Sequence, residues 1–187
     1  MKAKILKIAV ATILLLNLIS CGLYAQSRVT LNLTQDAKLL MFGDDKGNNP
    51  GTIDLAFSSE WQSLQGKHGY FFIRPEVEYA DLRGGIYRRY SGNIGYTFNQ
   101  WVDKIEFSAS AGFGTLDYDV GYSSFGGNLQ TGISLTKDLI FYLDLEITER
   151  RDLLKYNSTN KVLGTAWRLS GKLGVKVIVF RCDPSSR

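Results

Sequence analysis

The sequence is poor in the residues from which catalytic and metal sites are most often built. Among its 187 residues it has one histidine, His68, and two cysteines, Cys21 and Cys182. Two cysteines are too few for a metal site made of cysteine, and no serine is arranged beside His68 as a nucleophile for acyl transfer. We therefore predict that the protein is not an enzyme, holds no metal and needs no cofactor.

Long apolar runs are also scarce. The longest, Ile8 to Ile19, is shorter than the about 20 residues that a membrane-spanning helix needs. Three lysines precede it, and no acidic residue occurs before Asp36. A basic start followed by a short apolar run is typical of a secretory signal peptide. We expect residues 1–25 to be such a peptide, cleaved after Ala25.

What the chain does contain is alternation of apolar and polar residues. It is clearest at 165–180, where one face would carry Trp167, Leu169, Leu173, Val175, Val177 and Val179, and the other Arg168, Ser170, Lys172, Gly174 and Lys176. A helix would scatter these charges around its circumference, so the period of two indicates a β-strand. Seven more such segments precede it, at 28–34, 52–61, 70–82, 86–98, 104–115, 122–135 and 139–151.

These segments predict an all-β fold, an eight-stranded antiparallel up-and-down β-barrel over residues 26–182, with a short tail at 183–187. A tilted strand crosses a bilayer with about 9–11 residues, which most of the segments supply. If the N-terminus is periplasmic, the turns at 62–68, 99–103 and 136–138 lie inside the cell envelope. The connections at 35–51, 83–85, 118–121 and 152–161 would then lie outside. Pro75 lacks an N–H group, so we expect a bulge or a local break there.

Alternation alone does not say which face points inward, and a soluble barrel would place the apolar face inside. Three features favour the inverted, transmembrane arrangement. The polar face at 104–135 is mainly Ser, Gly, Asn and Gln, which suits a crowded interior. Aromatic residues occur near the strand ends, as expected at membrane interfaces; we predict this role for Trp61, Tyr79, Tyr90 and Trp167.

The third feature is that charges on the polar face nearly cancel. Ions buried in a lumen are tolerated when they are paired and hydrogen-bonded. We therefore predict a plugged lumen crossed by an ion-pair network of Arg74, Glu76, Glu78, Arg89, Glu106, Asp144, Glu146, Arg150, Arg168, Lys172 and Lys176.

The last predicted strand resembles the assembly signal of outer-membrane barrels, which combines a polar residue, a glycine, spaced apolar residues and a terminal aromatic. Lys172, Gly174, Val177, Val179 and Phe180 match it. In size and hairpin rhythm the mature chain is similar to the small OmpA/OmpX-type barrels, although it continues past the aromatic through residues 181–187. The resemblance implies a monomer in outer-membrane lipid, inserted by the barrel-assembly machinery.

The processing site has an alternative. Leu18 to Cys21 resembles a bacterial lipobox, in which Cys21 would become a lipidated first residue. An embedded barrel needs no lipid anchor, which favours the cut after Ala25. Either cut removes three lysines from a net charge of +4 and leaves +1, so charge gives no argument for binding nucleic acid.

Three functions stay open at this point. The first is a non-enzymatic outer-membrane barrel that displays surface loops for envelope integrity, adhesion or binding, with a loop ligand that the sequence does not identify. The second is a narrow porin-like channel. The third is a secreted or lipid-anchored soluble β-barrel that binds an apolar ligand.

Overall fold

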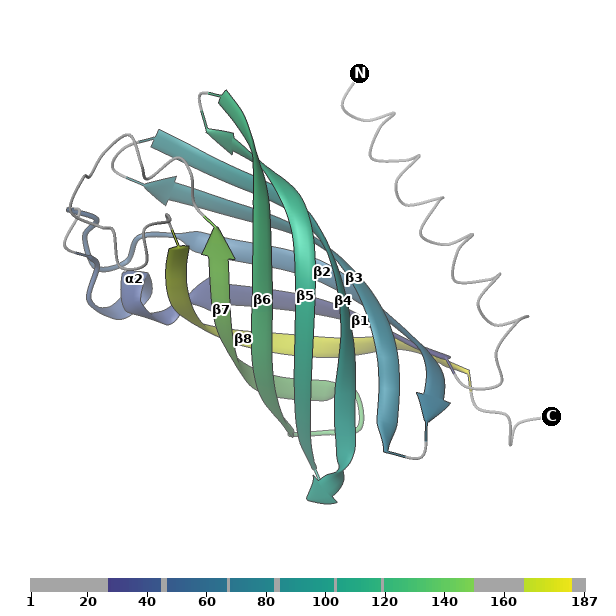
Figure 1. Cartoon of the computed structure of the whole chain (residues 1–187). Helices are drawn as coiled ribbons and strands as arrows, with labels where there is room; N and C mark the ends of the chain where they lie inside the picture. Colours follow the sequence, from purple (N-terminus) through teal and green to yellow (C-terminus); the bar gives the residue numbers. More distant parts are fainter. Residues whose placement is uncertain are drawn as a thin grey trace.

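The computed structural model describes residues 27–44, 47–66, 68–82, 85–102, 104–118, 120–149 and 167–182. Within them, eight antiparallel strands follow one another and close into a barrel (Figure 1). The predicted eight-stranded antiparallel up-and-down fold is confirmed. The strands are β1 (Ser27–Asp36), β2 (Asp54–Gly66), β3 (Gly69–Leu82), β4 (Gly85–Val102), β5 (Ile105–Tyr118), β6 (Val120–Ser134), β7 (Leu139–Glu149) and β8 (Trp167–Cys182).

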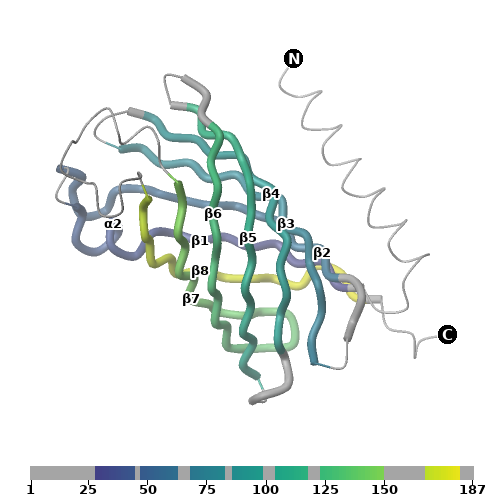
Figure 2. Tube along the Cα trace, viewed as in Figure 1, coloured from purple at the N-terminus to yellow at the C-terminus, as the bar shows by residue number. Residues whose placement is uncertain are grey.

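Closure of the barrel joins the first and last strands of the chain. β1 pairs with β8 from Ser27 opposite Cys182 to Asp36 opposite Lys172, so the two run side by side (Figure 2). Closure gives each strand two partners and removes the free edges that an open sheet would expose. The predicted signal peptide at 1–25, both of its candidate cleavage sites and the tail at 183–187 lie outside the described residues.

The wall of the barrel is apolar on its outer face and polar on its inner face. On β8, Leu169 is 76% exposed, whereas Lys172 is 1% exposed. The same alternation runs along β3 and β7, where every second side chain is buried. The predicted assignment of the two faces is therefore confirmed: apolar residues point outward and charged residues point into the lumen.

The strands extend further than the sequence indicated. β5 and β6 pair up to Tyr118 opposite Val120, so the predicted loop at 118–121 is wrong. β4 continues to Val102, which shortens the predicted turn at 99–103, and β2 continues to Gly66, which shortens the one at 62–68. Interstrand hydrogen bonds across the closed sheet support strand conformation in segments whose composition is that of a turn.

Pro75 interrupts one ladder and leaves the other intact. It lies opposite Gly92 in an unbroken register with β4. Towards β2, pairing stops after Ser58 opposite Glu76 and resumes at Trp61 opposite Ile73 in the same register. The predicted local break is thus present on one side only, without a bulge, because proline removes one donor and adds no residue.

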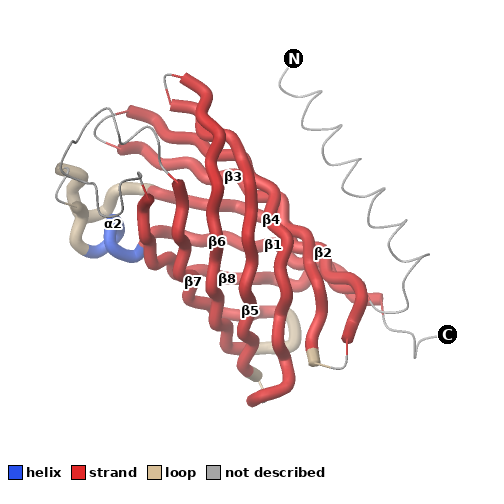
Figure 3. Tube along the Cα trace, viewed as in Figure 1, coloured by secondary structure: helices blue, strands red, loops and turns tan. Residues whose placement is uncertain are grey.

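A short helix, α2 (Ala37–Met41), opens the connection between β1 and β2 (Figure 3). Asp36 caps it, since its carboxylate accepts a hydrogen bond from the backbone N–H of Leu39 at 2.9 Å. β8 extends five residues beyond its last pair with β1, and α2, which follows directly after Asp36, packs against β8. No helix in the described ranges is long and apolar enough to cross a membrane.

Candidate functional site

The most distinctive site of the molecule is the cluster of charged side chains inside the barrel. Alternate residues of every strand point into the lumen, and these are mainly polar. The buried charged side chains that face it are Asp36, Asp54, Glu60, Arg74, Glu76, Glu78, Arg89, Asp144, Glu146, Lys172 and Lys176.

Lys172 lies at the centre of the tightest group. Its Nζ is 2.7 Å from Oε1 of Glu78 and 2.6 Å from Oε2 of Glu146. Arg89 binds the other oxygen of Glu146 through Nη1 at 2.6 Å and lies 3.9 Å from Glu78. The Tyr87 hydroxyl donates to Glu78 at 2.9 Å. These charges come from β3, β4, β7 and β8, so the group ties opposite walls of the barrel together.

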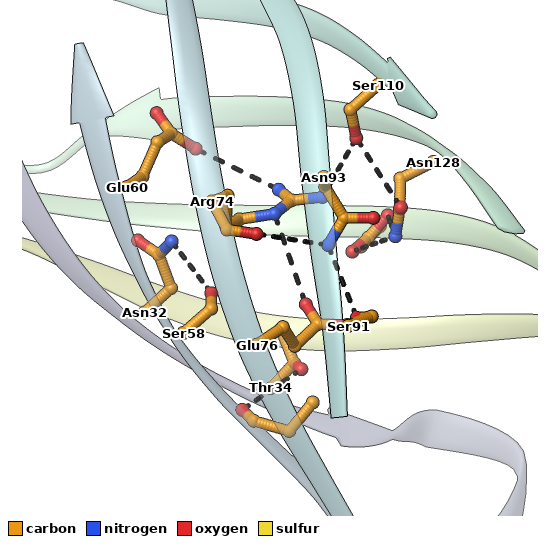
Figure 4. A network of polar contacts seen from close by, with 12 residues as sticks. Asn32, Thr34, Ser58, Glu60, Arg74, Glu76, Ser91, Asn93, Ser110 and Asn128 are labelled. Carbon is orange, nitrogen blue, oxygen red and sulfur yellow. Dashed lines mark hydrogen bonds and ion pairs between the residues drawn. The ribbon is translucent and has the colours of Figure 1, made fainter. Parts of the chain in front are cut away.

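Arg74 and Glu60 form a second group (Figure 4). Nη1 of Arg74 is 3.8 Å from Glu60, and its Nη2 donates to the hydroxyl of Ser110 at 2.9 Å. Glu60 also accepts a 2.6 Å hydrogen bond from Gln62 and lies 3.4 Å from Nζ of Lys176. The contacts of Arg74 with carboxylates are longer than those around Lys172, and its Nε and Nη1 have no hydrogen-bond partner.

An ion pair lies near each end of the lumen. At the α2 end, Arg168 donates to Asp36 at 2.6 Å and to Asp54 at 2.8 Å. At the other end, Arg28 donates to Glu106 at 2.9 Å and to the hydroxyl of Tyr70 at 2.7 Å. The side chains of these two arginines are 19% and 20% exposed, whereas those of Arg74, Arg89 and Lys172 are 1% exposed. Exposure thus falls from the ends of the barrel to its middle.

Two residues of the predicted network are not seen in ion pairs within the described ranges. Arg150 lies outside the described residues. Asp144 is held by amides, because Asn128 and Gln130 donate to it at 3.0–3.3 Å and no described cation lies within ion-pair distance. Sequence reasoning also missed Arg28 and Asp36. Both have even numbers, like the inward residues Thr30, Asn32 and Thr34 of β1. Arg28 lies within the predicted segment 28–34 and Asp36 lies two residues beyond its end, so the period of two would have found both.

The predicted interface aromatics all lie on the outer face. Tyr79, Tyr90 and Trp167 are 39%, 48% and 37% exposed. Trp61 is less exposed than these three, being half-buried, and its indole nitrogen has no hydrogen-bond partner. Their placement at the membrane surface remains a prediction.

Small residues on β5 and β6 make room for the long cations. A Cβ atom on Gly126 would lie 2.7 Å from Nη2 of Arg89, and one on Gly112 would overlap Oδ1 of Asn93. Glycine and serine dominate this part of the inner wall, whereas the buried lysines and tyrosines and the central arginines come from β3, β4, β7 and β8. The interior is therefore filled by large side chains from these strands, and the small residues of β5 and β6 leave space for them.

Gly174 provides a test of this packing. A Cβ atom there would lie 2.5 Å from Cγ2 of Thr34 and 2.7 Å from the backbone oxygen of Leu33. We expect Gly174→Ala to lower the free energy of unfolding by about 1–3 kcal/mol, as overpacking does elsewhere. Urea unfolding of the refolded protein measures this. Gly171→Ala in the same strand is the control, because its Cβ would meet only Leu145 at 4.0 Å; equal effects of the two substitutions would contradict the packing argument.

The described side chains of the lumen form interactions between fixed charges, and among them no reaction centre is recognisable. His68 is exposed at the turn between β2 and β3. Among the described residues, no group of three His, Cys, Asp or Glu side chains is placed to hold a metal ion. Of the residues matching an assembly signal, Lys172 and Gly174 point inward, and Val177, Val179 and Phe180 are exposed on the outer face.

Comparison with known proteins gives fold-level likenesses only. No protein-family profile matches the chain, and no curated protein matches it by sequence. Among solved structures, the chain is similar to a de novo designed transmembrane β-barrel, with 10% identity, a TM-score of 0.48 and coverage of 83% of this chain and 97% of that one. It is also similar to Neisserial surface protein A (NspA), with 8% identity, a TM-score of 0.42 and coverage of 81% and 94%. Neither likeness bears on what this chain binds.

Proposed function

We propose that this protein is an integral outer-membrane β-barrel with a lumen plugged by ion pairs, and that its role is to display surface loops and support the envelope without catalysis. The proposal rests on the distribution of side chains across the barrel wall, in which apolar residues face outward and charged residues face inward. Ile94, Leu129 and Leu169 are 61–76% exposed, whereas the long cations of the lumen are buried. Water makes such an outer surface unfavourable, and lipid makes it favourable.

The shape of the barrel supports an orientation. The connections at the end where β1 begins and β8 ends are short, from Gly66 to Gly69, Val102 to Ile105 and Ser134 to Leu139. The opposite end carries the two longest connections, from Asp36 to Asp54 and from Glu149 to Trp167. Outer-membrane barrels have short periplasmic turns and longer extracellular loops. We therefore assign α2 to the cell surface and both termini to the periplasm.

Biogenesis follows from the same proposal. We infer that the barrel-assembly machinery recognises β8 through Lys172, Gly174, Val177, Val179 and Phe180, and that the protein works as a monomer in outer-membrane lipid. Substitution of the outward-facing Phe180 by alanine should reduce the amount of folded barrel in cells more than it reduces refolding in detergent. Equal losses in the two measurements would contradict a role in recognition.

Heat-modifiability tests the proposal directly. Detergent-refolded protein is expected to migrate differently on a gel before and after boiling, because a closed barrel resists the detergent until it is heated. It is also expected to partition with detergent and with outer-membrane fractions. A protein that shows one mobility, stays soluble without detergent and fractionates with the periplasm would instead be a soluble barrel.

Planar-bilayer recording tests whether the ion pairs in the lumen prevent the passage of ions. The three central cations are 1% exposed and bonded across the lumen, so the refolded protein is expected to give no stepwise conductance. Reproducible single-channel steps from the pure protein would replace the plugged lumen with a narrow channel.

A further inference from the structure

The outer face of the barrel has a groove that the proposed function does not yet use. It has a volume of about 320 Å³ and is lined by Phe125, Gly126, Gly127, Ile147 and Trp167. These residues lie on β6, β7 and β8, which are neighbours in the wall (Figure 1). Ligand pockets span about 300–1,000 Å³, so the groove has the size of a small binding site.

Gly127 keeps the groove open. It points outward between Ala111 of β5 and Ile147 of β7, and having no side chain it leaves a depression in the apolar wall. A Cβ atom on Gly127 would lie 3.4 Å from the backbone oxygen of Ser110 and 3.8 Å from Cγ2 of Ile147. These are ordinary contact distances, so the wall itself does not require glycine there.

The surroundings of the groove identify the kind of ligand that fits it. Phe125 packs on Phe113 with ring centroids 5.0 Å apart, and the pair Thr115–Ser123 comes next towards the end of the hairpin. Both of these polar residues are exposed on the outer face. In the other direction the outer face continues with apolar residues such as Leu129 and Leu145. The groove therefore lies at the boundary between a polar rim and the apolar band, with apolar side chains and glycine as its lining.

We propose that this groove holds a fatty acyl chain of a lipid in the extracellular leaflet, with Trp167 against the chain and the headgroup at the level of Thr115 and Ser123. The inference rests on the proposed membrane location. Amphipathic rings such as that of Trp167 favour the interface between headgroups and acyl chains. The groove is continuous with the outer apolar band, so an acyl chain enters it without leaving an apolar environment.

Fluorescence quenching tests the groove. Trp61→Phe and Trp101→Phe leave Trp167 as the single tryptophan. The variant is refolded into phosphatidylcholine vesicles whose acyl chains are brominated, and bromine quenches a nearby indole. We expect strong quenching of Trp167, and we expect Gly127→Leu in this background to remove much of it, because leucine fills the groove. Gly127→Ala should have an intermediate effect.

Gly92→Leu is the matched control. Gly92 also points outward in a strand, opposite Pro75 and Phe113, and a Cβ atom there would meet nothing within 4 Å. This substitution should leave the quenching of Trp167 unchanged. A gel shift on boiling verifies that each variant is folded.

The outcomes separate the two proposals. Equal quenching of Trp167 with and without the Gly127→Leu substitution would overturn the groove and leave the membrane location standing. Absence of quenching in every folded variant, including one that retains only Trp61, would overturn the membrane location itself. Native mass spectrometry adds a second readout, since one lipid should be retained by the wild type and by Gly92→Leu but lost from Gly127→Leu.

Discussion

Replacing Lys172 by methionine is expected to lower the free energy of unfolding by about 3–5 kcal/mol, the range found when one partner of a buried ion pair is removed. Lys172 is 1% exposed and lies within 2.7 Å of two carboxylates, Glu78 and Glu146. Methionine preserves most of the volume, so the main change is that two buried anions lose their shared cation. Arg89 still binds Glu146, but its distance to Glu78 is 3.9 Å.

Urea unfolding of the refolded barrel measures this effect, and three further variants, among them Glu78→Gln alone, assign its cause. Lys137→Met removes a lysine from an exposed turn and should change the free energy of unfolding little. Lys172→Met combined with Glu78→Gln removes one anion together with the cation and should recover part of the loss. If the loss of unfolding free energy in the double variant equals the sum of the losses in Lys172→Met and Glu78→Gln, the two side chains do not interact as their geometry indicates.

Substitution of an isoleucine by arginine in the middle of the outer face is expected to have the second large effect on the free energy of unfolding. Ile94 on β4 is 67% exposed and lies well inside the apolar stretch of its strand. Ile94→Arg should lower the free energy of unfolding in lipid vesicles by about 2–4 kcal/mol, as arginine does at the bilayer midplane of other barrels. In water, the same substitution at an exposed site would be close to neutral.

A second isoleucine of β4, close to the end of the strand, provides the control. Ile86 also points outward, is 49% exposed and lies one residue from the start of β4. Ile86→Arg should lower the free energy of unfolding by only about 0–1 kcal/mol, because a side chain near the interface reaches water. Equal and small effects at both positions would show that the outer face is not embedded in lipid.

The period of two along each segment determined much of the fold before any tertiary information. Adjacent side chains of a strand point to opposite faces as a consequence of backbone geometry, so Leu169 and Lys172 had to lie on different faces of β8. The same rule assigns Arg28 and Asp36 to the inner face of β1. Strand count follows as well, since eight alternating segments recur at hairpin spacing.

Strand ends were less predictable because they depend on partners. Asp117 and Gly121 have the composition of a turn, yet they pair with each other across β5 and β6. Likewise α2 forms where β1 stops pairing with β8, and its first turn is held by the Asp36 cap. Local propensity is a weak influence where a neighbouring strand satisfies the backbone hydrogen bonds.

By itself, then, the sequence determined which side chains share a face, because alternation is a property of the extended backbone. The composition of the two faces then predicted that the charged face is the inside, but only the tertiary structure decided which charges meet there. Lys172 and Glu78 are 94 residues apart in the chain, and they come within 2.7 Å because closure of the barrel leaves only β1 and β2 between β8 and β3 around one narrow lumen. No local sequence pattern predicts this distance, because it depends on the register of every strand between β3 and β8.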